Sequence, residues 1–334
     1  MGPRTFEWVD NAIVTPDQRL FPHENRAMRL ATVDDLVAAI RSLAVRGAPA
    51  LGVAGAFGVA LSAHSHPDDL EQVKIDADRI ANARPTAVNL AWGVARALTR
   101  LADGPAAVLA EARAVLDEDE RVNRTAATRA ADLLRRLGPD RPLRVLTHCN
   151  AGRLATGAWG TALGAIRDLA DRDAVEFVIA TETRPLLQGA RLTAWELAEA
   201  GIPYRVCVDS AAPALISRGL VDCVVVGADR IAVNGDTANK IGTYSLALAA
   251  ARAGIPFVVV APESTVDPDL PDGTGIHIEE RTTDEVTNFA GQHTAPEGAE
   301  AFNPAFDVTP ADLITAVVTE ERIILDPDRH SPAT

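Results

Sequence analysis

Two reactive side chains, a thiol and a carboxyl, stand where two apolar segments of this chain end. Residues 143–149 have the pattern of a short strand that ends at Cys149, and residues 221–228 form a second apolar strand that leads to Asp229. In an open parallel α/β sheet, ligands bind beyond the carboxyl ends of the strands. We therefore predict that Cys149 and Asp229 face the same edge of one sheet, as a candidate base and a candidate acid.

The surroundings of the two groups should set their pKa values. Residues 153–169 predict a helix of small residues after Cys149. Because a helix start offers unpaired N–H groups and a positive dipole end, we expect the thiol pKa to lie below its ordinary value of about 8.5. Burial among apolar residues would raise the pKa of Asp229, whereas Arg230 and Lys240 would lower it. The sequence leaves the balance at Asp229 open.

Neighbouring residues offer a second interpretation of the cysteine. His148 precedes Cys149, which would suit a cysteine–histidine pair. Consecutive strand residues point to opposite faces, and this argues against direct pairing. The other two cysteines, Cys207 and Cys223, fall inside apolar strands and are predicted to be small core residues.

Three cations lie beside turn or helix-start signals, namely Arg46, Arg84 and Lys240. Next to Arg46, the Gly47-Ala48 turn precedes a predicted helix, so its backbone N–H groups are free to bind an anion such as phosphate. Each cation alone is more typical of a solvated surface. Together they predict a phosphate pocket drawn from two parts of the chain.

Composition limits the classes of partner. The chain of 334 residues carries 32 basic and 46 acidic side chains and has a formal net charge of −14. A surface of that sign repels nucleic acid and anionic membranes, so we expect neither as a partner. The apolar stretches at residues 52–63 and 255–261 are too short to span a bilayer. The N-terminal segment is too polar for a signal peptide, and the three cysteines show neither metal-ligand spacing nor a disulfide framework. We expect a cytoplasmic protein without a metal.

The elements that must position these groups change in kind along the chain. Helical periodicity dominates the first part, at residues 33–44, 105–116 and 125–137, and a breaker cluster follows at residues 138–142. Beyond it, predicted strands alternate with predicted helices, which indicates a parallel, doubly wound sheet. The strands are expected at residues 143–149, 175–181, 204–208, 223–227 and 257–261, and the helices at 153–169, 189–200, 212–218 and 240–253.

We place the domain boundary at the breaker cluster. The prediction is an α/β protein with a mainly helical N-terminal domain at 1–138, a catalytic domain at 139–329 and a disordered tail at 330–334. A parallel sheet alone would also suit an NAD-dependent dehydrogenase. The glycine-rich segment at residues 52–58 has neither the dinucleotide nor the P-loop spacing, so we expect no nucleotide cofactor.

Several long motifs resemble one family closely and cover the chain from about residue 8 to residue 320. They are Arg46-Gly-Ala-Pro-Ala-Leu-Gly52, Arg84-Pro-Thr-Ala-Val-Asn89, Thr147-His-Cys-Asn-Ala-Gly152, Glu182-Thr-Arg-Pro-Leu-Leu-Gln-Gly-Ala-Arg191, Gly227-Ala-Asp-Arg230, Asn239-Lys-Ile-Gly242, Ile278-Glu-Glu-Arg281 and Asn303-Pro-Ala-Phe-Asp-Val-Thr-Pro310. These motifs resemble S-methyl-5-thioribose-1-phosphate isomerases.

The resemblance implies a Rossmann-like C-terminal domain, a homodimer, and a metal-free, cofactor-free aldose–ketose isomerase of methionine salvage. It places the catalytic pair on Cys149 and Asp229. It places the contacts to the sugar phosphate on Arg46, Gly47, Ala48, Arg84, Gln188, Asn239 and Lys240.

The resemblance also leaves alternatives. Isomerases of 5-deoxyribose 1-phosphate and of ribose 1,5-bisphosphate share this architecture and differ in the surroundings of sugar C5. Regulatory subunits of the eukaryotic translation-initiation guanine exchange factor share the fold without the Cys and Asp pair. The chain departs from the family pattern at Thr181, Arg153 and His277. Of these, Arg153 is expected close enough to Cys149 to lower its pKa or to alter the fit of the substrate.

The implied reaction starts from a blocked sugar. A phosphate on the anomeric oxygen prevents spontaneous ring opening, so an acid must protonate the ring oxygen, and Asp229 is the candidate. Cys149 would then remove the proton from C2. A direct hydride shift, with Cys149 stabilising the transition state, fits the same residues.

Overall fold

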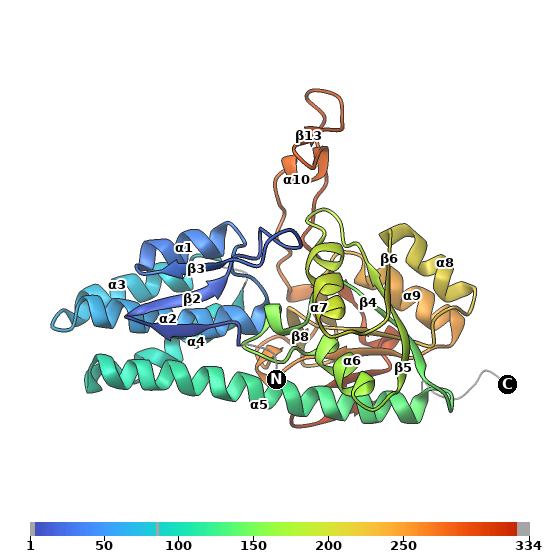
Figure 1. Ribbon diagram of the computed structural model, residues 1–334, viewed down its shortest axis with the longest axis horizontal. Helices are drawn as coiled ribbons and strands as arrows, with labels where there is room; N and C mark the ends of the chain where they lie inside the picture. Colours follow the sequence, from blue (N-terminus) through green and yellow to red (C-terminus); the bar gives the residue numbers. More distant parts are fainter. Residues whose placement is uncertain (1–3, 85–86, 326–334) are drawn as a thin grey trace.

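The computed structural model describes residues 4–84 and 87–325, so the predicted tail at 330–334 lies outside the described residues. A mainly helical N-terminal part adjoins an α/β part built on a mostly parallel sheet (Figure 1), which confirms the predicted fold class. The N-terminal part also holds a three-stranded antiparallel sheet that the periodicity did not predict. Its strands are β1 (Glu7–Val9), β2 (Ala12–Pro16) and β3 (Ala27–Leu30).

One almost wholly apolar helix, α2 (Ala48–Ser65), forms the centre of the N-terminal part. Its length and composition would suffice to cross a membrane, so the expectation that this stretch is too short for a span was wrong, because the helix extends beyond residues 52–63 on both sides. In the fold, 78% of it is buried, which accounts for its composition. The helices packed around it are α1 (Val33–Arg41), α3 (Leu70–Ala81), α4 (Val88–Leu98) and α5 (Pro105–Leu137).

The long helix α5 connects the two parts and runs beneath both of them (Figure 1). It is continuous through residues 117–124, where the sequence predicted two separate helical stretches. Its first half, from Val108 to Leu116, packs in the N-terminal core. Its second half, from Ala126 to Leu134, packs against the sheet. The two hydrophobic cores therefore meet along one helix.

The α/β part is a seven-stranded sheet with the order β16-β15-β10-β7-β4-β5-β6. Only β16 runs antiparallel to its neighbour. The strands are β4 (Leu143–Thr147), β5 (Val175–Thr181), β6 (Tyr204–Cys207), β7 (Cys223–Val226), β10 (Phe257–Val260), β15 (Ala316–Val318) and β16 (Ile323–Leu325). Helices cover both faces, since successive residues such as Val145 and Leu146 belong to different buried clusters. The helices are α6 (Ala162–Ala170), α7 (Ala194–Glu199), α8 (Ala212–Ser217) and α9 (Thr243–Ala253).

The order of the strands brings the two reactive groups to one place. Strand β4, which leads to Cys149, pairs in parallel with β7, which leads to Asp229. The prediction that both strands belong to one sheet and end at the same edge is confirmed.

Two predicted helices differ from the structure near this edge. Instead of one helix over 153–169, a 3-10 turn at Arg153–Ala155 is followed by a loop, and α6 begins only at Ala162. Gly152 and Gly160 form an isolated β-bridge across this loop, and Gly160 has φ = +94°, so a helix cannot continue there.

The second difference concerns residues 240–242. Lys240 ends a strand, and α9 begins at Thr243. The strand belongs to a four-stranded sheet with the order β11-β8-β9-β14, which the sequence analysis did not predict. Its members are β8 (Arg230–Ala232), β9 (Thr237–Lys240), β11 (Val266–Asp267) and β14 (Phe306–Thr309).

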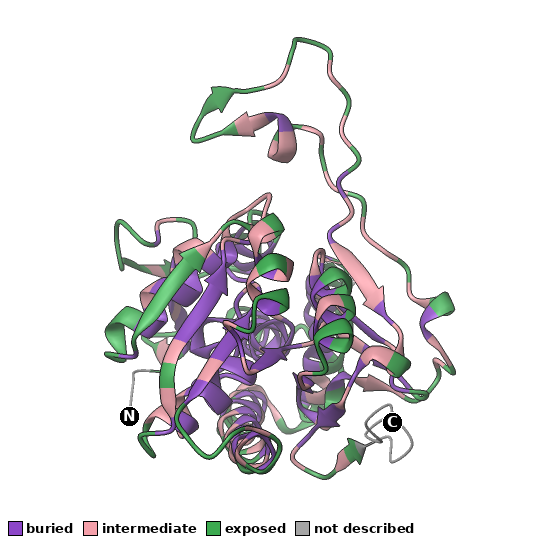
Figure 2. Ribbon diagram, turned by 90° about the vertical axis from the view of Figure 1, so that its right-hand side faces the viewer, coloured by how far each residue is buried: buried purple, intermediate pink, exposed green. Residues whose placement is uncertain are grey.

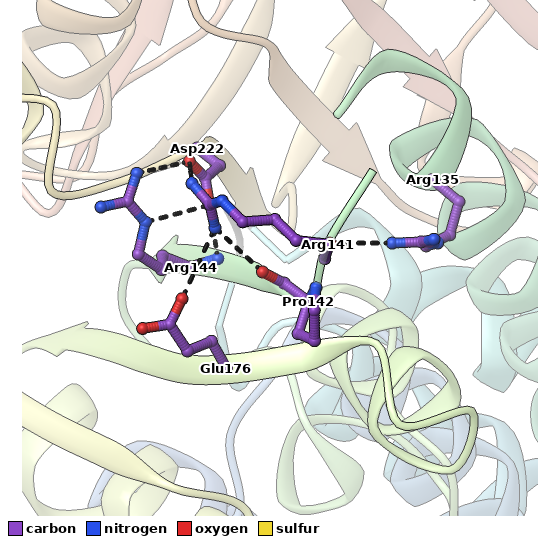
Figure 3. A network of polar contacts seen from close by, with 6 residues as sticks. All are labelled: Arg135, Arg141, Pro142, Arg144, Glu176 and Asp222. Atoms are coloured by element: carbon purple, nitrogen blue, oxygen red, sulfur yellow. Dashed lines mark hydrogen bonds and ion pairs between the residues drawn. The ribbon is translucent and has the colours of Figure 1, made fainter. Parts of the chain in front are cut away.

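At the opposite, amino-terminal edge of the large sheet, charged side chains form a network of ion pairs and hydrogen bonds (Figure 3). Asp222, just before β7, accepts hydrogen bonds from the guanidinium groups of Arg144 at 2.7 Å and Arg141 at 2.8 Å. These two cations lower the pKa of the Asp222 carboxyl to about 2, against desolvation by burial, which acts in the other direction and is the largest single influence. Arg141 also lies 3.5 Å from Glu176.

A narrow arm leaves the α/β part and returns to it before β14 (Figures 1 and 2). It contains α10 (Asp284–Thr287), β12 (Asn288–Phe289) and β13 (Gln292–His293), and most of its surface is exposed. Arg184 attaches the arm to the body, because its guanidinium donates to the carbonyl oxygen of Val286 and lies over the ring of Phe289.

Candidate active site

All nine residues predicted for the site line one cavity at the carboxyl edge of β4 and β7, between the two parts of the chain. They are Cys149, Asp229, Arg46, Gly47, Ala48, Arg84, Gln188, Asn239 and Lys240. The N-terminal part supplies the turn before α2 and the residue after α3, and the α/β part supplies the strand ends. The structure therefore brings these nine residues together in one cavity formed by both parts of the chain.

Cys149 occupies a sharp turn directly after β4. Its backbone has φ = +60°, a conformation that a residue with a side chain adopts rarely and that recurs at functional sites. Two threonines hold the turn: the Cys149 N–H donates to Thr183 Oγ1 at 2.9 Å, and Thr193 Oγ1 donates to the Cys149 carbonyl at 2.6 Å. The tertiary contacts thus fix the direction of the thiol.

The expected electrostatics of the thiol were wrong. No α-helix starts beside Cys149, since α6 begins at Ala162, and the helix-dipole argument therefore fails. Desolvation raises the pKa of the Cys149 thiol above its ordinary value, although the cations of Arg46 and Lys240 act against it. The neutral thiol is consequently favoured in the free protein.

At Asp229 the structure decides the balance that the sequence left open. Desolvation by burial raises the pKa of this carboxyl, and it outweighs the opposing effects of Lys240, Arg84 and Arg46. Arg230, which the sequence analysis placed among the opposing charges, turns away and forms an ion pair with Asp267 at 2.7 Å. The environment therefore favours the protonated acid at Asp229.

Arg46 reaches the cavity from the turn before α2. Its Nη2 donates to Asn150 Oδ1 at 2.7 Å and to the Asn150 carbonyl at 3.1 Å. The next residue, Gly47, has φ = +98°, and a Cβ there would lie 2.5 Å from backbone atoms of Ala155. Only glycine therefore allows the turn to come so close to the loop after Cys149.

Lys240 points into the cavity from the end of β9. Its Nζ donates to the Ala305 carbonyl at 2.8 Å and lies 4.6 Å from the centre of the Phe306 ring. Desolvation lowers the pKa of Lys240, while Cys149 and Asp229 act in the opposite direction.

The third cation, Arg84, is held by a carboxylate. Glu279 Oε2 accepts from Arg84 Nη2 at 3.1 Å, and Glu279 Oε1 accepts from Arg281 Nη1 at 2.6 Å. Desolvation is the largest single influence on the pKa of Glu279 and raises it, but the combined effects of the two guanidinium groups outweigh it and lower the pKa. Glu279 thereby offsets part of the positive charge on this side of the cavity.

Several buried polar atoms of the site have no hydrogen-bond partner within the described residues. They are Arg46 Nε, Arg84 Nε and Gln188 Oε1. A buried polar group without a partner costs free energy, so such atoms are typical of a site that a ligand completes. Two unpaired guanidinium N–H donors suit an anion, and an amide oxygen suits a hydroxyl donor.

Sequence reasoning missed several residues of the cavity wall. Arg281 and Phe306 line the cavity, and both stand in motifs that carry the resemblance, which was the signal available to find them. His148 also lines it. The His148 ring does not pair with the thiol: Nε2 donates to the Ile241 carbonyl at 2.8 Å, and Nδ1 lies 2.6 Å from Thr181 Oγ1. Burial lowers the pKa of His148, so the neutral ring is favoured.

Arg153 does not act on Cys149 as expected. Its guanidinium pairs with Glu199 at 2.7 Å and lies over the ring of Trp195. It is not among the largest influences on the Cys149 pKa, and its contacts to Glu199 and Trp195 direct its side chain to α7.

Sequence comparison places these features in a family. The profile of the Initiation factor 2 subunit family matches residues 44–324. A probable bifunctional methylthioribose-1-phosphate isomerase/methylthioribulose-1-phosphate dehydratase of Nocardia farcinica is 63% identical over 95% of this chain, which spans only 58% of that relative. A methylthioribose-1-phosphate isomerase of Anaeromyxobacter sp. strain K is 53% identical over 95% of this chain and 92% of its own length.

Solved structures agree on the fold. The crystal structure of a 5-methylthioribose 1-phosphate isomerase from Pyrococcus horikoshii has a TM-score of 0.89 at 37% identity and covers 98% of this chain and 94% of its own. A structure from A. fulgidus, described as translation initiation factor eIF-2B subunit delta, has a TM-score of 0.86 at 40% identity and covers 98% of this chain and 97% of its own.

Proposed function

This chain belongs to the initiation factor 2 subunit family, and we propose that it is the aldose–ketose isomerase that converts S-methyl-5-thioribose 1-phosphate into S-methyl-5-thioribulose 1-phosphate in methionine salvage. The relatives named as isomerases of this sugar phosphate support the substrate. The alternative from another class of protein is a non-catalytic regulatory subunit. The similarity to a structure described as an initiation factor subunit supports this alternative.

One observation carries the proposal: a thiol, an acid and unpaired cationic donors converge on one cavity. Cys149 and Asp229 line it together, and the guanidinium Nε atoms of Arg46 and Arg84 have no partner within the described chain. An acid catalyst needs a carboxyl with a raised pKa, as Asp229 has, because the group must carry a proton to donate. A subunit that only binds a ligand does not need such a group beside a thiol.

In the proposed mechanism, Asp229 opens the sugar ring. The phosphate blocks the anomeric oxygen, so the ring oxygen must be protonated before its bond to C1 can break, which leaves an electron-poor C1 that keeps the phosphate on its other oxygen. Burial raises the pKa of Asp229 and keeps the carboxyl protonated at a higher pH than in water, which supplies the acid. Arg46, Arg84 and Lys240 hold the phosphate, and the free Oε1 of Gln188 accepts from a sugar hydroxyl.

The transfer of hydrogen from C2 to C1 has two forms. In one form, Cys149 as a thiolate removes the C2 proton and returns it to C1; in the other, hydride moves directly from C2 to C1 beside a neutral thiol. In both forms the C2 hydroxyl loses its proton to give the ketone, and the Asp229 carboxylate left by the ring opening takes it up. Because desolvation raises the pKa of the thiol, the neutral form predominates and supports the hydride shift. The reaction run in deuterated water separates them: deuterium at C1 of the product would indicate proton transfer through the thiol, and its absence would exclude that route.

The charge of the cavity bears on the substituent at sugar C5. Glu279 holds Arg84 and Arg281 together, whereas Arg46 and Lys240 have no carboxylate bound to them within residues 4–84 and 87–325. This balance supports a single phosphate rather than a bisphosphate. The cavity wall also includes the apolar side chains of Leu43, Pro49, Leu186, Pro262 and Phe306, which suit a methylthio or methyl group.

The decisive experiment assays purified protein on three sugar phosphates side by side: S-methyl-5-thioribose 1-phosphate, 5-deoxyribose 1-phosphate and ribose 1,5-bisphosphate. We expect the highest kcat/KM for the first. A preference for either of the others would change the assigned substrate, and no turnover of any of the three would favour the regulatory subunit.

We also propose that the protein works as a cytoplasmic homodimer. The cysteines are free, which suits a reducing compartment.

The dimer interface is proposed at strand β6, which forms an edge of the sheet. Tyr204 and Val206 in this strand and Val208 just after it are exposed apolar residues, a surface that a second copy would cover. Light scattering after size-exclusion chromatography tests the dimer, and a monomeric mass would contradict it. Cell fractionation tests the compartment.

A further inference from the structure

A buried carboxylate lies behind the cavity wall, at a distance from the reacting groups. Glu196, on α7, is only 4% exposed. Its Oε1 accepts from Asn150 Nδ2 at 2.9 Å and from the Leu154 N–H at 3.4 Å, and its Oε2 accepts from the Arg153 N–H at 2.8 Å. The carboxylate thus binds the loop that follows Cys149 through donors on both oxygens.

The Glu196 carboxylate fixes the orientation of the Asn150 amide. A carboxylate only accepts hydrogen bonds, so Asn150 must present its Nδ2 group to Glu196, and its Oδ1 must face the other way. There, Oδ1 accepts from Arg46 Nη2 at 2.7 Å. If the Asn150 amide were rotated by 180°, its NH2 group would face the Arg46 N–H donors and its oxygen would face the Glu196 carboxylate. Both contacts would be repulsive, because an arginine only donates and a carboxylate only accepts.

The fit around Glu196 is close. A Cβ added at Gly152 would lie 2.3 to 2.4 Å from the carboxylate oxygens, so the turn after Cys149 packs directly on the carboxylate. A buried negative charge also needs compensation, and the Arg46 guanidinium, one amide away, supplies part of it. Geometry and charge therefore link Glu196, Asn150 and Arg46 in one chain of hydrogen bonds.

We propose that Glu196 is a positioning residue for substrate binding: through the Asn150 amide it holds the Arg46 guanidinium so that its unpaired Nε–H faces the phosphate. The inference deepens the proposed function, because it rests on Arg46 as a ligand of the sugar phosphate. The Cys149 thiol and the Asp229 carboxyl make none of these contacts, although Asn150 Nδ2 also lies 3.2 Å from Thr193 Oγ1, which donates to the Cys149 carbonyl.

The first test is Glu196→Gln, which keeps the shape of the side chain. An amide can accept on one side only, so its NH2 group must oppose a donor, either Asn150 Nδ2 or the Arg153 N–H. The first orientation breaks the contact to the Asn150 amide, and the second loosens the loop that carries it, so in both the hold on Arg46 is weakened. We expect KM for the sugar phosphate to rise ~10- to 100-fold, as for the loss of a charge-assisted hydrogen bond, while kcat changes less than ~3-fold. The matched control is Glu199→Gln on the same helix, which binds the Arg153 side chain and should leave KM within ~2-fold.

The second test asks whether Glu196 acts through Arg46. In an Arg46→Ala background, Glu196→Gln should raise KM no further, because the residue that it positions is gone; the two effects should be non-additive. A KM increase of the same size in both backgrounds would overturn the proposal and indicate a general disturbance of the loop. An unchanged KM in the single variant would overturn it as well.

Binding of inorganic phosphate, followed by calorimetry, separates this proposal from the proposed function. If the protein turns over none of the sugar phosphates, the isomerase assignment fails, yet a ~10-fold weaker binding of phosphate by Glu196→Gln than by wild type still supports the positioning role. Equal phosphate affinity would refute it. If Glu196→Gln does not fold, as judged by thermal melting, Asn150→Ala interrupts the same chain of contacts and must show the same non-additivity with Arg46→Ala.

Discussion

Cys149 and Asp229 line one cavity, and burial shifts the pKa values of both groups in the same direction. Desolvation raises the pKa of the thiol and of the carboxyl alike, although three cations lie nearby. For an acid catalyst a raised pKa is useful, because the carboxyl keeps its proton to a higher pH than it would in water. For a thiolate base it is a disadvantage, and a neutral thiol beside a moving hydride fits the surroundings better.

The residue-scale prediction concerns this pair. Cys149→Ser and Asp229→Asn should each lower kcat by at least ~10²-fold while substrate binding persists, since each removes a group that acts on the reacting atoms. Steady-state kinetics together with a direct measurement of ligand binding checks both parts. Turnover close to that of wild type in either variant would refute the role of that residue.

A second prediction at this scale uses the pH profile. Asp229 must be protonated to act as an acid, so kcat should fall as the pH rises through the pKa of this carboxyl, which burial holds above its ordinary value. Lys240→Ala removes the largest influence that lowers this pKa, so the fall in kcat should move to higher pH, and KM should rise with the loss of a phosphate contact. A profile that shifts to lower pH in Lys240→Ala would contradict the assignment.

At the scale of elements, loops held by buried carboxylates shape the cavity. Asp119 on α5 accepts a hydrogen bond from the Gly157 N–H at 2.5 Å and so ties α5 to the loop between Cys149 and α6. Glu196 on α7 ties the same loop from the other side. Helices that belong to the two hydrophobic cores therefore hold one catalytic loop between them.

Asp119 makes a pH-dependent contribution to stability. Burial raises the pKa of its carboxyl from 3.8 to about 7. The folded protein therefore binds this proton more tightly than the unfolded chain, and the contribution is full below pH ~4 and is lost as the pH rises to about 7. Between pH 5 and pH 7, the free energy of unfolding should fall by about 2 kcal/mol more in wild type than in Asp119→Asn, which keeps an acceptor for Gly157 and does not titrate. Urea denaturation at the two pH values measures the free energy of unfolding of both proteins. An equal change between pH 5 and pH 7 in wild type and variant would refute the prediction.

The network at the amino-terminal edge of the sheet should affect stability alone (Figure 3). Asp222→Ala removes the common acceptor of Arg141 and Arg144 and should cost about 2 kcal/mol at pH 7, while kcat and KM stay unchanged because the site lies at the opposite edge. The pKa of Asp222 is lowered to about 2, so its contribution is present above pH ~4 and is lost as the pH falls toward 2. The difference between variant and wild type should therefore shrink at pH 3, and a difference that grows instead would contradict this explanation.

At the scale of the whole molecule, α5 makes the two parts depend on each other. Its first half completes the N-terminal core and its second half covers one face of the sheet. The division into domains 1–138 and 139–329 remains a prediction. It can be tested, because α5 contributes to both cores and a cut at residue 138 removes it from the sheet. Separate folding units need cores of their own.

We expect wild type to unfold in a single cooperative transition, and a fragment of residues 139–329 to be unstable, because it lacks the face of α5 formed by residues 126–134. A fragment of residues 117–329 keeps that face and serves as the control. Calorimetry and circular dichroism of both fragments check the expectation. Equal stability of the two fragments would show that the sheet does not need the helix.

Local pattern determined much of the fold. The strands at 143–147, 175–181, 204–207, 223–226 and 257–260 lie within or match the predicted segments, because short apolar runs between turn signals leave few alternatives. Of the helix predicted over 153–169, the second half is α6, but the first half was wrong, because the periodicity of residue types carries no information on the bridge between Gly152 and Gly160. The small sheet containing β9 was missed because its partner β14 lies far along the chain.

The sequence by itself determined which side chains meet: strand ends and long motifs brought nine residues to one cavity, with Cys149 and Asp229 at one sheet edge. Only the tertiary structure decided their electrostatics. It turned Arg230 and Arg153 away from the cavity, placed no helix start beside the thiol, and set Glu196 behind Asn150 and Arg46. The physical reason is that residue types and spacing are local, whereas desolvation and the direction of a charge depend on which distant segments pack around it.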